Sequence, residues 1–227
     1  MHVVVNVAVS ADGKLSTRRR EQVRISGGDD FARVDCLRAE SDAVLVGIGT
    51  VLADDPHLTL DDPALREERA ANGEPSHPAR VVVDSRGRTP LDARILDDAA
   101  TTYVVVAEAA DPDRRNDLAS AGAEVLVAGE ERVDLSHAIE TLAERGVDDL
   151  MVEGGGEIIF SLFEAGLVDE LSLFVGSLVI GGRDAPTLAD GAGFVESFAS
   201  LDLREVSRVD DGVLLRYDVD ETAVGSR

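Results

Sequence analysis

The chain has very little lysine, cysteine or aromatic side chain. Lys14 is the only lysine among 22 basic residues, Cys36 is the only cysteine, tryptophan is absent, and aromatic residues make up 4% of the 227 residues. One cysteine excludes an internal disulfide and a thiolate metal cage. The four histidines show no metal-ligand spacing, so we expect no metal. No apolar stretch reaches the ~18 residues typical of a membrane span, and the first residues lack the features of a signal peptide.

Acidic residues outnumber basic ones by 45 to 22, which gives a net charge of −23. Such a chain will not follow a phosphate backbone, so we expect neither a nucleic-acid nor a membrane partner. The acidity could steer a cationic partner, or it could keep the surface hydrated in concentrated salt. The scarcity of lysine favours the second explanation, since at about 1 M salt the Debye length is only ~3 Å and self-repulsion is screened. We therefore expect a halophilic, cytoplasmic protein; the alternative is an ordinary acidic protein.

Predicted strands and helices alternate along most of the chain. Strands are predicted at 3–9, 42–47, 80–85, 102–107, 123–128, 149–155, 171–180, 203–209 and 212–219, and helices at 29–40, 112–121, 135–145 and 157–165. The turn Asp210-Asp211-Gly212 is a strong hairpin signal. This order predicts an α/β fold of three layers, with a mixed central sheet and an antiparallel C-terminal hairpin. We expect a single domain over 1–220, a surface insertion at 61–78 with one helical turn at most, and a frayed tail at 221–227.

Three predicted strands are followed by residues suited to ligand binding, because ligands of open α/β sheets bind at the carboxyl ends of strands. The first such segment is GIGTVLADDP, residues 47–56. Its glycines allow a ligand to approach the backbone, Thr50 could cap a helical turn and bind phosphate, and Asp54 is a candidate carboxylate. The alternative is an ordinary glycine turn followed by a solvated acidic pair.

The second segment is Glu153-Gly154-Gly155-Gly156-Glu157, which opens a predicted helix. Glycines at a helix N-terminus can cradle a phosphate with free N–H groups, and Glu153 would lie at the tip of the strand. The alternative is a tight turn with a surface glutamate. The segment matches neither the dinucleotide fingerprint of the Rossmann fold nor a P-loop.

The third segment, residues 84–88, carries Ser85, Arg86 and Arg88, which could bind a ribose 2′-phosphate. The alternative is a basic turn that balances nearby acids. Lys14 and Arg38 could likewise meet an anionic ligand or form ordinary ion pairs. Cys36 is expected to pack in the core or to have no role, because a nucleophile would need a histidine partner.

Several strings, taken in order, resemble the riboflavin-biosynthesis reductases. They are SADGKLS, RISGGDDFARVDCLRAESDAVLVGIGTVLADDPHLTL, ARVVVDSRGRTP, MVEGGGEIIFSLFEAGLVDEL and IGGRDAPTL, and they cover residues 3–219. This family includes the C-terminal half of bacterial RibD and stand-alone reductases, and its fold is similar to that of dihydrofolate reductase. The resemblance implies an oxidoreductase that takes hydride from NADPH, with NADH possible, and reduces C1′ of a phosphoribosylamino pyrimidine. It also implies a homodimer.

The zinc deaminase that bacterial RibD also carries has a histidine–cysteine signature, which is absent here. The chain therefore resembles a stand-alone reductase, and the lack of a deaminase favours a substrate that is still aminated.

The resemblance also implies roles for individual residues. The expected cofactor contacts are Ala8, Ser10, Thr50, Asp54, Ser85, Arg86, Gly154, Gly155, Gly156 and Glu157. The expected substrate contacts are Arg24, Arg38 and Glu153, with Asp54 also facing the substrate. Asp61 stands where the bacterial pattern has arginine, and Arg24 stands where it has an aromatic residue. Arg24, or one of Arg18 to Arg20, could therefore bind the substrate phosphate, or Arg24 could stack on a ring.

Ring opening of the aminoglycoside would give an imine at C1′. Asp54 and Glu153 are expected to act in catalysis by stabilising its cationic form. Two alternatives stay open. One is a pterin or folate reductase of the same fold, and the other is a nucleotide-binding module without catalysis.

Overall fold

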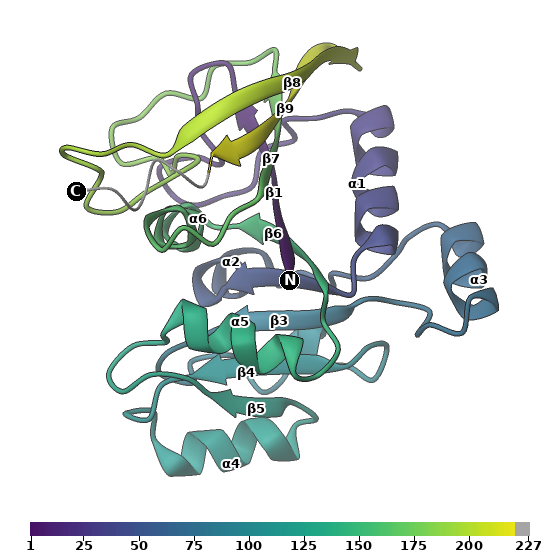
Figure 1. Cartoon of the computed structure of the whole chain (residues 1–227), viewed down its shortest axis with the longest axis vertical. Helices are drawn as coiled ribbons and strands as arrows, with labels where there is room; N and C mark the ends of the chain where they lie inside the picture. Colours follow the sequence, from purple (N-terminus) through teal and green to yellow (C-terminus); the bar gives the residue numbers. More distant parts are fainter. Residues whose placement is uncertain (221–227) are drawn as a thin grey trace. The chain divides into compact units, whose positions relative to one another are not determined.

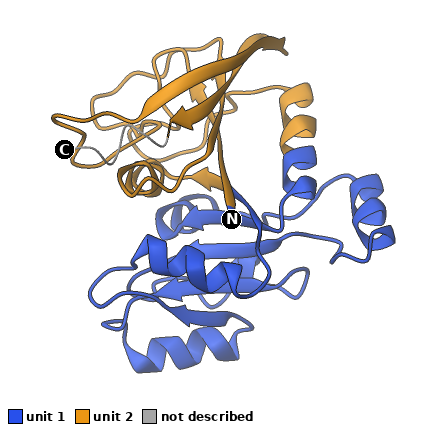
Figure 2. Ribbon diagram, viewed as in Figure 1, with its two compact units in different colours: residues 1, 35–151 blue, residues 2–34, 152–227 orange. Residues whose placement is uncertain are grey.

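The structure, a computed structural model, describes residues 1–220 (Figure 1). It divides into two compact units, coloured separately in Figure 2. Unit 1 consists of Met1 and Asp35–Met151, and unit 2 contains His2–Val34 and continues from Val152. Helix α1 (Gly28–Glu40) and strand β6 (Asp149–Gly154) have residues in both. No helix in the described range is long and apolar enough to cross a membrane.

Unit 1 contains a parallel sheet whose strands follow the order β5-β4-β3-β2. These strands are β2 (Ala43–Gly47), β3 (Ala79–Val83), β4 (Thr102–Val106) and β5 (Glu124–Val127). The first three are apolar and buried along most of their length, as expected for parallel strands covered on both faces. Helices α4 (Pro112–Ser120) and α5 (Leu135–Ala143) pack on β5, and α2 (Ile48–Asp54) packs on β2 and β3. The carboxyl ends of β2 and β3 therefore lie at one edge of this sheet.

The predicted insertion contains more helix than expected. Helix α3 (Pro63–Ala71) is nine residues long, so the expectation of one turn at most was wrong. Asp62 caps it by accepting the Ala64 N–H, and Pro63 occupies its first turn, which are ordinary helix-start signals. The buried Arg69 guanidinium donates to the carbonyl oxygens of Ala39 and Ser41, at 2.6 and 2.9 Å. A 3-10 helix, η1 (Arg94–Leu96), was not predicted.

Unit 2 contains the mixed part of the sheet. Strand β1 (His2–Ser10) pairs in parallel with β7 (Glu170–Gly176), and β7 pairs antiparallel with β9 (Gly212–Asp220). Strand β8 (Ser200–Val209) completes the hairpin with β9, so the α/β class, the mixed sheet and the C-terminal hairpin are confirmed. The predicted strand 171–180 was too long, because β7 ends at Gly176. Helix α6 (Gly156–Glu164) follows β6.

The first half of α1 is fastened to the rest of unit 2 by polar groups. The Asp210 carboxylate, in the hairpin turn, accepts the N–H groups of Asp29 and Asp30 at 3.2 and 3.0 Å. Arg33 donates to Asn6 and to Ser172, at 2.9 and 3.0 Å. Residues far apart in the sequence thus set the start of this helix.

Candidate active site

Helix α2 begins directly at the end of the buried strand β2. Gly47 is its N-cap residue and supplies no side-chain cap. Thr50 is half-buried inside the helix, so the expectation that it caps the helix was wrong. Asp54 is the last helical residue and is also half-buried. Asp54 therefore ends a helix that follows directly on the buried strand β2.

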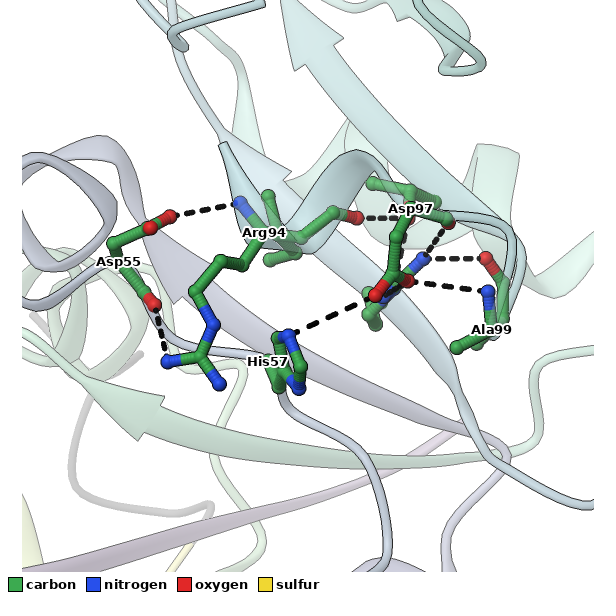
Figure 3. Close-up of polar contacts among 9 residues, drawn as sticks. Asp55, His57, Arg94, Asp97 and Ala99 are labelled. Atoms are coloured by element: carbon green, nitrogen blue, oxygen red, sulfur yellow. Dashed lines mark hydrogen bonds and ion pairs between the residues drawn. The ribbon is translucent and has the colours of Figure 1, made fainter. Parts of the chain in front are cut away.

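Asp55, the neighbour of Asp54, turns the chain sharply. It adopts the left-handed conformation (φ 42°, ψ 60°), and its N–H donates to the Val51 carbonyl at 3.0 Å. Its side chain accepts the Arg94 N–H at 2.8 Å, and its carbonyl accepts from the Arg94 guanidinium at 3.4 Å (Figure 3). Asp55 therefore contacts η1 through both its side chain and its main chain.

Figure 3 also shows a second link to η1. His57 Nε2 lies 3.7 Å from Asp97 Oδ2, and the fully buried Arg80 guanidinium binds Asp97 Oδ1 at 2.7 Å. Burial would raise the pKa of Asp97, but the hydrogen bond from Arg80 and the neighbouring positive charges hold that pKa below its ordinary value. Asp55 and His57, which follow Asp54, thus contact η1 and Asp97, and the buried Arg80 guanidinium binds Asp97.

The next residues of this segment are held through their backbone. Arg38 donates to the Thr59 carbonyl at 3.1 Å. The Asp35 carboxylate accepts the Asp61 N–H at 3.0 Å, so the residue that replaces the bacterial arginine is held by its main chain. Arg38, which is expected to bind the substrate phosphate, therefore also has a structural role. Its guanidinium has five N–H donors in all.

His77 receives the Leu60 N–H on Nδ1 at 3.1 Å. Burial, followed by the charges of Arg66, Arg80 and Arg69, lowers the pKa of His77. The neutral imidazole, which alone can accept this hydrogen bond, is therefore the favoured form.

The turn after β3 carries the third predicted group. The buried Asp84 carboxylate accepts from the N–H and hydroxyl of Thr89 at 2.7 and 2.8 Å, and Arg88 Nε lies 3.7 Å from its other oxygen. Ser85 Oγ accepts the Val133 N–H at 3.0 Å, which leaves its hydroxyl hydrogen to donate. Arg86 is exposed. Arg88 thus balances a nearby acid, as the alternative interpretation of this turn predicts. Ser85 and Arg86 are the residues of the turn that could bind an anion.

In unit 2, three polar residues of the turn after β1 bind one another or nearby backbone groups. The buried Ser10 hydroxyl donates to Asp12 Oδ1 at 2.6 Å and accepts the Lys14 N–H at 2.9 Å. Asp12 also accepts the N–H groups of Ile180 and Gly181, and the Ser10 hydrogen bond is the main reason that its pKa falls to about 2. Lys14 Nζ donates to the Ala185 carbonyl at 3.2 Å.

This turn uses the side chain of Ser10 within the protein. Its neighbour Ala8 is half-buried and packs against the cluster of Ile25, Phe174 and Leu214. If Ser10 contacts the cofactor as expected, it must do so with a hydroxyl that already binds Asp12 and the Lys14 N–H.

The three glycines at the start of α6 occupy their positions for different structural reasons. Gly154 has a φ of +130°, which favours glycine, and its peptide bond to Gly155 is cis. Gly155 is the N-cap of α6. A Cβ on Gly156 would overlap the Thr187 carbonyl oxygen and the Asp190 carboxylate. Close packing of 187–190 therefore explains Gly156, and the backbone conformation explains Gly154.

The residues on either side of these glycines are the two glutamates of the predicted cradle. Glu153 is half-buried near the end of β6, and Glu157 is exposed in the first turn of α6.

Arg24 lies outside the regular elements. Its guanidinium carbon lies 5.7 Å from the centroid of the Phe31 ring, and its Nε donates to the Ser26 carbonyl at 3.3 Å. Phe31 is 53% exposed, so this pair presents a charged and aromatic surface to solvent. This contact with a side chain of the protein tests neither of the two uses predicted for Arg24. Cys36 is exposed on α1, so of its two expected fates the core position is wrong and the absence of a role stays a prediction.

Each unit brings together part of the predicted set. In unit 1, Thr50 and Asp54 share α2, while Ser85 and Arg86 follow the neighbouring parallel strand β3. In unit 2, hydrogen bonds run from the turn at Ser10 through residues 185–190 to Gly156. Within residues 1–220, no group of three or more histidine, cysteine, aspartate or glutamate side chains is arranged to hold a metal ion.

Comparisons with known proteins give the family. Residues 1–215 match the RibD C-terminal domain. A 2,5-diamino-6-ribosylamino-4(3H)-pyrimidinone 5′-phosphate reductase of Archaeoglobus fulgidus is 50% identical over 93% of this chain and 94% of its own length. A protein of the same name from Methanothermobacter thermautotrophicus is 42% identical over 96% of this chain and 98% of its own. The solved structure of Acinetobacter baumannii RibD, 28% identical, matches with a TM-score of 0.78 over 96% of this chain and 58% of that one. The chain belongs to the RibD C-terminal domain family, as its sequence motifs predicted.

Proposed function

We propose that this chain uses NADPH to reduce the ribosyl C1′ of 2,5-diamino-6-(5-phosphoribosylamino)pyrimidin-4(3H)-one, which yields the ribitylamino product of riboflavin biosynthesis. The observation that carries the proposal is the 50% identity, nearly end to end, with a reductase of that name. Both archaeal relatives that match over nearly their whole length are named for the 2,5-diamino pyrimidinone, which is the aminated form. The aminated pyrimidine is therefore the preferred candidate over the deaminated one.

Each unit carries residues that suit part of a nicotinamide cofactor, which would supply the hydride when bound. The glycine backbone at the start of α6 suits a pyrophosphate, because Gly154 has a positive φ and a Cβ on it would meet no atom within 4 Å. The exposed Arg86 and the hydroxyl of Ser85 suit a ribose 2′-phosphate, which favours NADPH over NADH. Ala8, Ser10, Thr50 and Asp54 complete the proposed cofactor contacts.

The proposed chemistry of the chain is electrostatic. Reduction needs an electron-poor C1′, which ring opening to a protonated imine provides. A carboxylate near that carbon stabilises the positive charge as it develops. We assign this role to Asp54 and Glu153, and we assign the substrate phosphate to Arg38 or to Arg24, which could instead stack its guanidinium on the pyrimidine.

The experiment is NADPH oxidation with the aminated and the deaminated pyrimidine in potassium chloride, repeated with NADH. We expect turnover with the aminated substrate and NADPH, and activity that rises with salt. Asp54→Asn should lower kcat far more than cofactor affinity. Turnover of a pterin or folate alone would favour the other reductase, and NADPH binding without oxidation would favour the non-catalytic module.

We also propose that the protein is a homodimer formed by the face of β7, β9 and β8. Leu203 and Val206 on this face are 55% and 59% exposed, and β8 is an edge strand. Val206→Glu should yield a monomer by light scattering. Val127→Glu, at an exposed valine on β5, is the matched control and should leave the mass unchanged. A wild-type protein that is monomeric at all salt concentrations would contradict the proposal.

A further inference from the structure

Asp54 is the last residue of α2, and Asp55 closes that end of the helix. A left-handed residue at a helix C-terminus is usually glycine, because other residues are strained there. Here it is an aspartate with φ 42°, whose N–H closes the helix on the Val51 carbonyl. Short polar side chains tolerate this conformation when they bind locally.

The Asp55 side chain supplies such a bond, and it reaches a different element. Oδ1 accepts the Arg94 N–H at 2.8 Å, while the Arg94 guanidinium donates to the Asp55 carbonyl at 3.4 Å (Figure 3). Both groups of Asp55 thus contact one residue of η1. Rotation of the peptide after Asp54 would break both contacts.

The position of η1, which Asp55 contacts, is fixed by buried residues of unit 1. Ile95 of η1 is fully buried, and Asp97 follows η1 directly. Arg80 donates to the carbonyl oxygens of Asp97 and Ala100 at 2.6 and 2.7 Å. The position of η1 is therefore set by the core of unit 1, and Asp55 transmits that position to the end of α2.

The bond from Asp55 to the Arg94 N–H lies in an exposed part of the structure. An exposed hydrogen bond contributes little to stability, because water replaces it when it is lost. Orientation is more sensitive, since displacement of a reacting group by about 1 Å can cost up to 100-fold in rate. The geometry therefore predicts that Asp55 affects turnover more than folding.

We infer that Asp55 is a positioning residue, which holds the Asp54 carboxylate in its reactive orientation by binding η1. This inference rests on the proposed catalytic role of Asp54. It assigns different tasks to two neighbouring residues of the same chemical type.

The test compares four variants in the full chain. Asp55→Ala removes the acceptor, and Asp55→Gly removes it while keeping the left-handed conformation free of strain. Asp55→Asn keeps both an acceptor and tolerance of that conformation. Asp111→Ala is the matched control, because Asp111 accepts a backbone N–H at an exposed helix start remote in sequence from α2.

We expect kcat to fall about 10- to 100-fold in Asp55→Ala and Asp55→Gly. The KM values and the melting temperature should change little, and Asp55→Asn should restore kcat. Equal kcat losses in Asp55→Ala and Asp111→Ala, or no recovery in Asp55→Asn, would overturn the inference. Asp54→Asn is measured in parallel. If it keeps wild-type kcat, the catalytic assignment fails and the positioning role falls with it. If it loses kcat while Asp55→Ala does not, the positioning role alone fails.

Discussion

Replacing the buried Arg80 should reveal how much of the stability of unit 1 depends on one guanidinium. The side chain is fully buried, and Arg80→Met keeps much of its length and apolar packing. The change removes four hydrogen bonds, to Thr102, Asp97 (its side chain and its carbonyl) and Ala100, at 2.6 to 2.9 Å. The partners of those bonds remain in place without their donor.

The expected loss follows from the exposure of the partner. Removing one member of a buried ion pair costs about 3–5 kcal/mol. The Asp97 side chain is 38% exposed and can regain water, so we expect about 3 kcal/mol, at the lower end of that range. For a chain of this size, this corresponds to a fall in Tm of about 6–12 °C.

The pH dependence gives a second readout. Because the pKa of Asp97 in the folded protein lies below its ordinary value of 3.8, the pair stabilises the fold above that pH and is lost as pH falls through the folded pKa. In Arg80→Met this part of the acid dependence should disappear.

The assay is thermal and urea unfolding at low and high potassium chloride. Arg204→Met is the control, since Arg204 Nε lies 2.5 Å from Asp218 Oδ2 but its side chain is 61% exposed. That pair should contribute about 0–1 kcal/mol, and less in salt. Equal losses of stability in the two variants would refute the reasoning from burial.

Three further predictions concern other parts of the chain. The pKa of His77 is lowered from 6.5, chiefly by burial, so the neutral imidazole stabilises the fold above about pH 6.5, and this contribution is lost as pH falls through the lowered pKa; His77→Asn, which keeps an acceptor for the Leu60 N–H, should flatten this dependence in unfolding free energies measured from pH 5 to 8. Gly156→Ala should weaken NADPH binding in calorimetry and lower Tm, while Gly28→Ala, where a Cβ meets no atom within 4 Å, should do neither. Asp210→Ala should cost about 1 kcal/mol and speed hydrogen exchange at the start of α1; unchanged exchange would contradict its capping role.

Local sequence patterns predicted the parts of the fold that local physics determines. Continuous apolar runs identified the strands of unit 1, and the Asp-Gly turn identified the C-terminal hairpin. Helix α3 was underestimated because its polar, proline-containing sequence is also typical of a loop. The end of β7 at Gly176 could not be predicted, because apolar residues continue beyond it.

The candidate site was predicted as a set of segments rather than as contacts. The sequence places Asp54 and Asp55 side by side, but only the structure shows that Asp55 binds η1, 39 residues away. Likewise, Lys14 drew attention as the only lysine, but only the structure shows that its Nζ donates to the Ala185 carbonyl, 171 residues away. Such partners depend on how the chain returns to the same place, which periodicity does not encode.

The cap of α1 by Asp210 has a consequence for synthesis on the ribosome. Its donors and acceptor are 181 and 180 residues apart, and β1 likewise pairs with β7 only after residue 170 has been made. Unit 1, by contrast, draws nearly all its residues from the continuous stretch Asp35–Met151. Domains made first tend to fold first. The parallel strands of unit 1 can therefore pair before β7 has been made, and β1 gains that neighbour only afterwards.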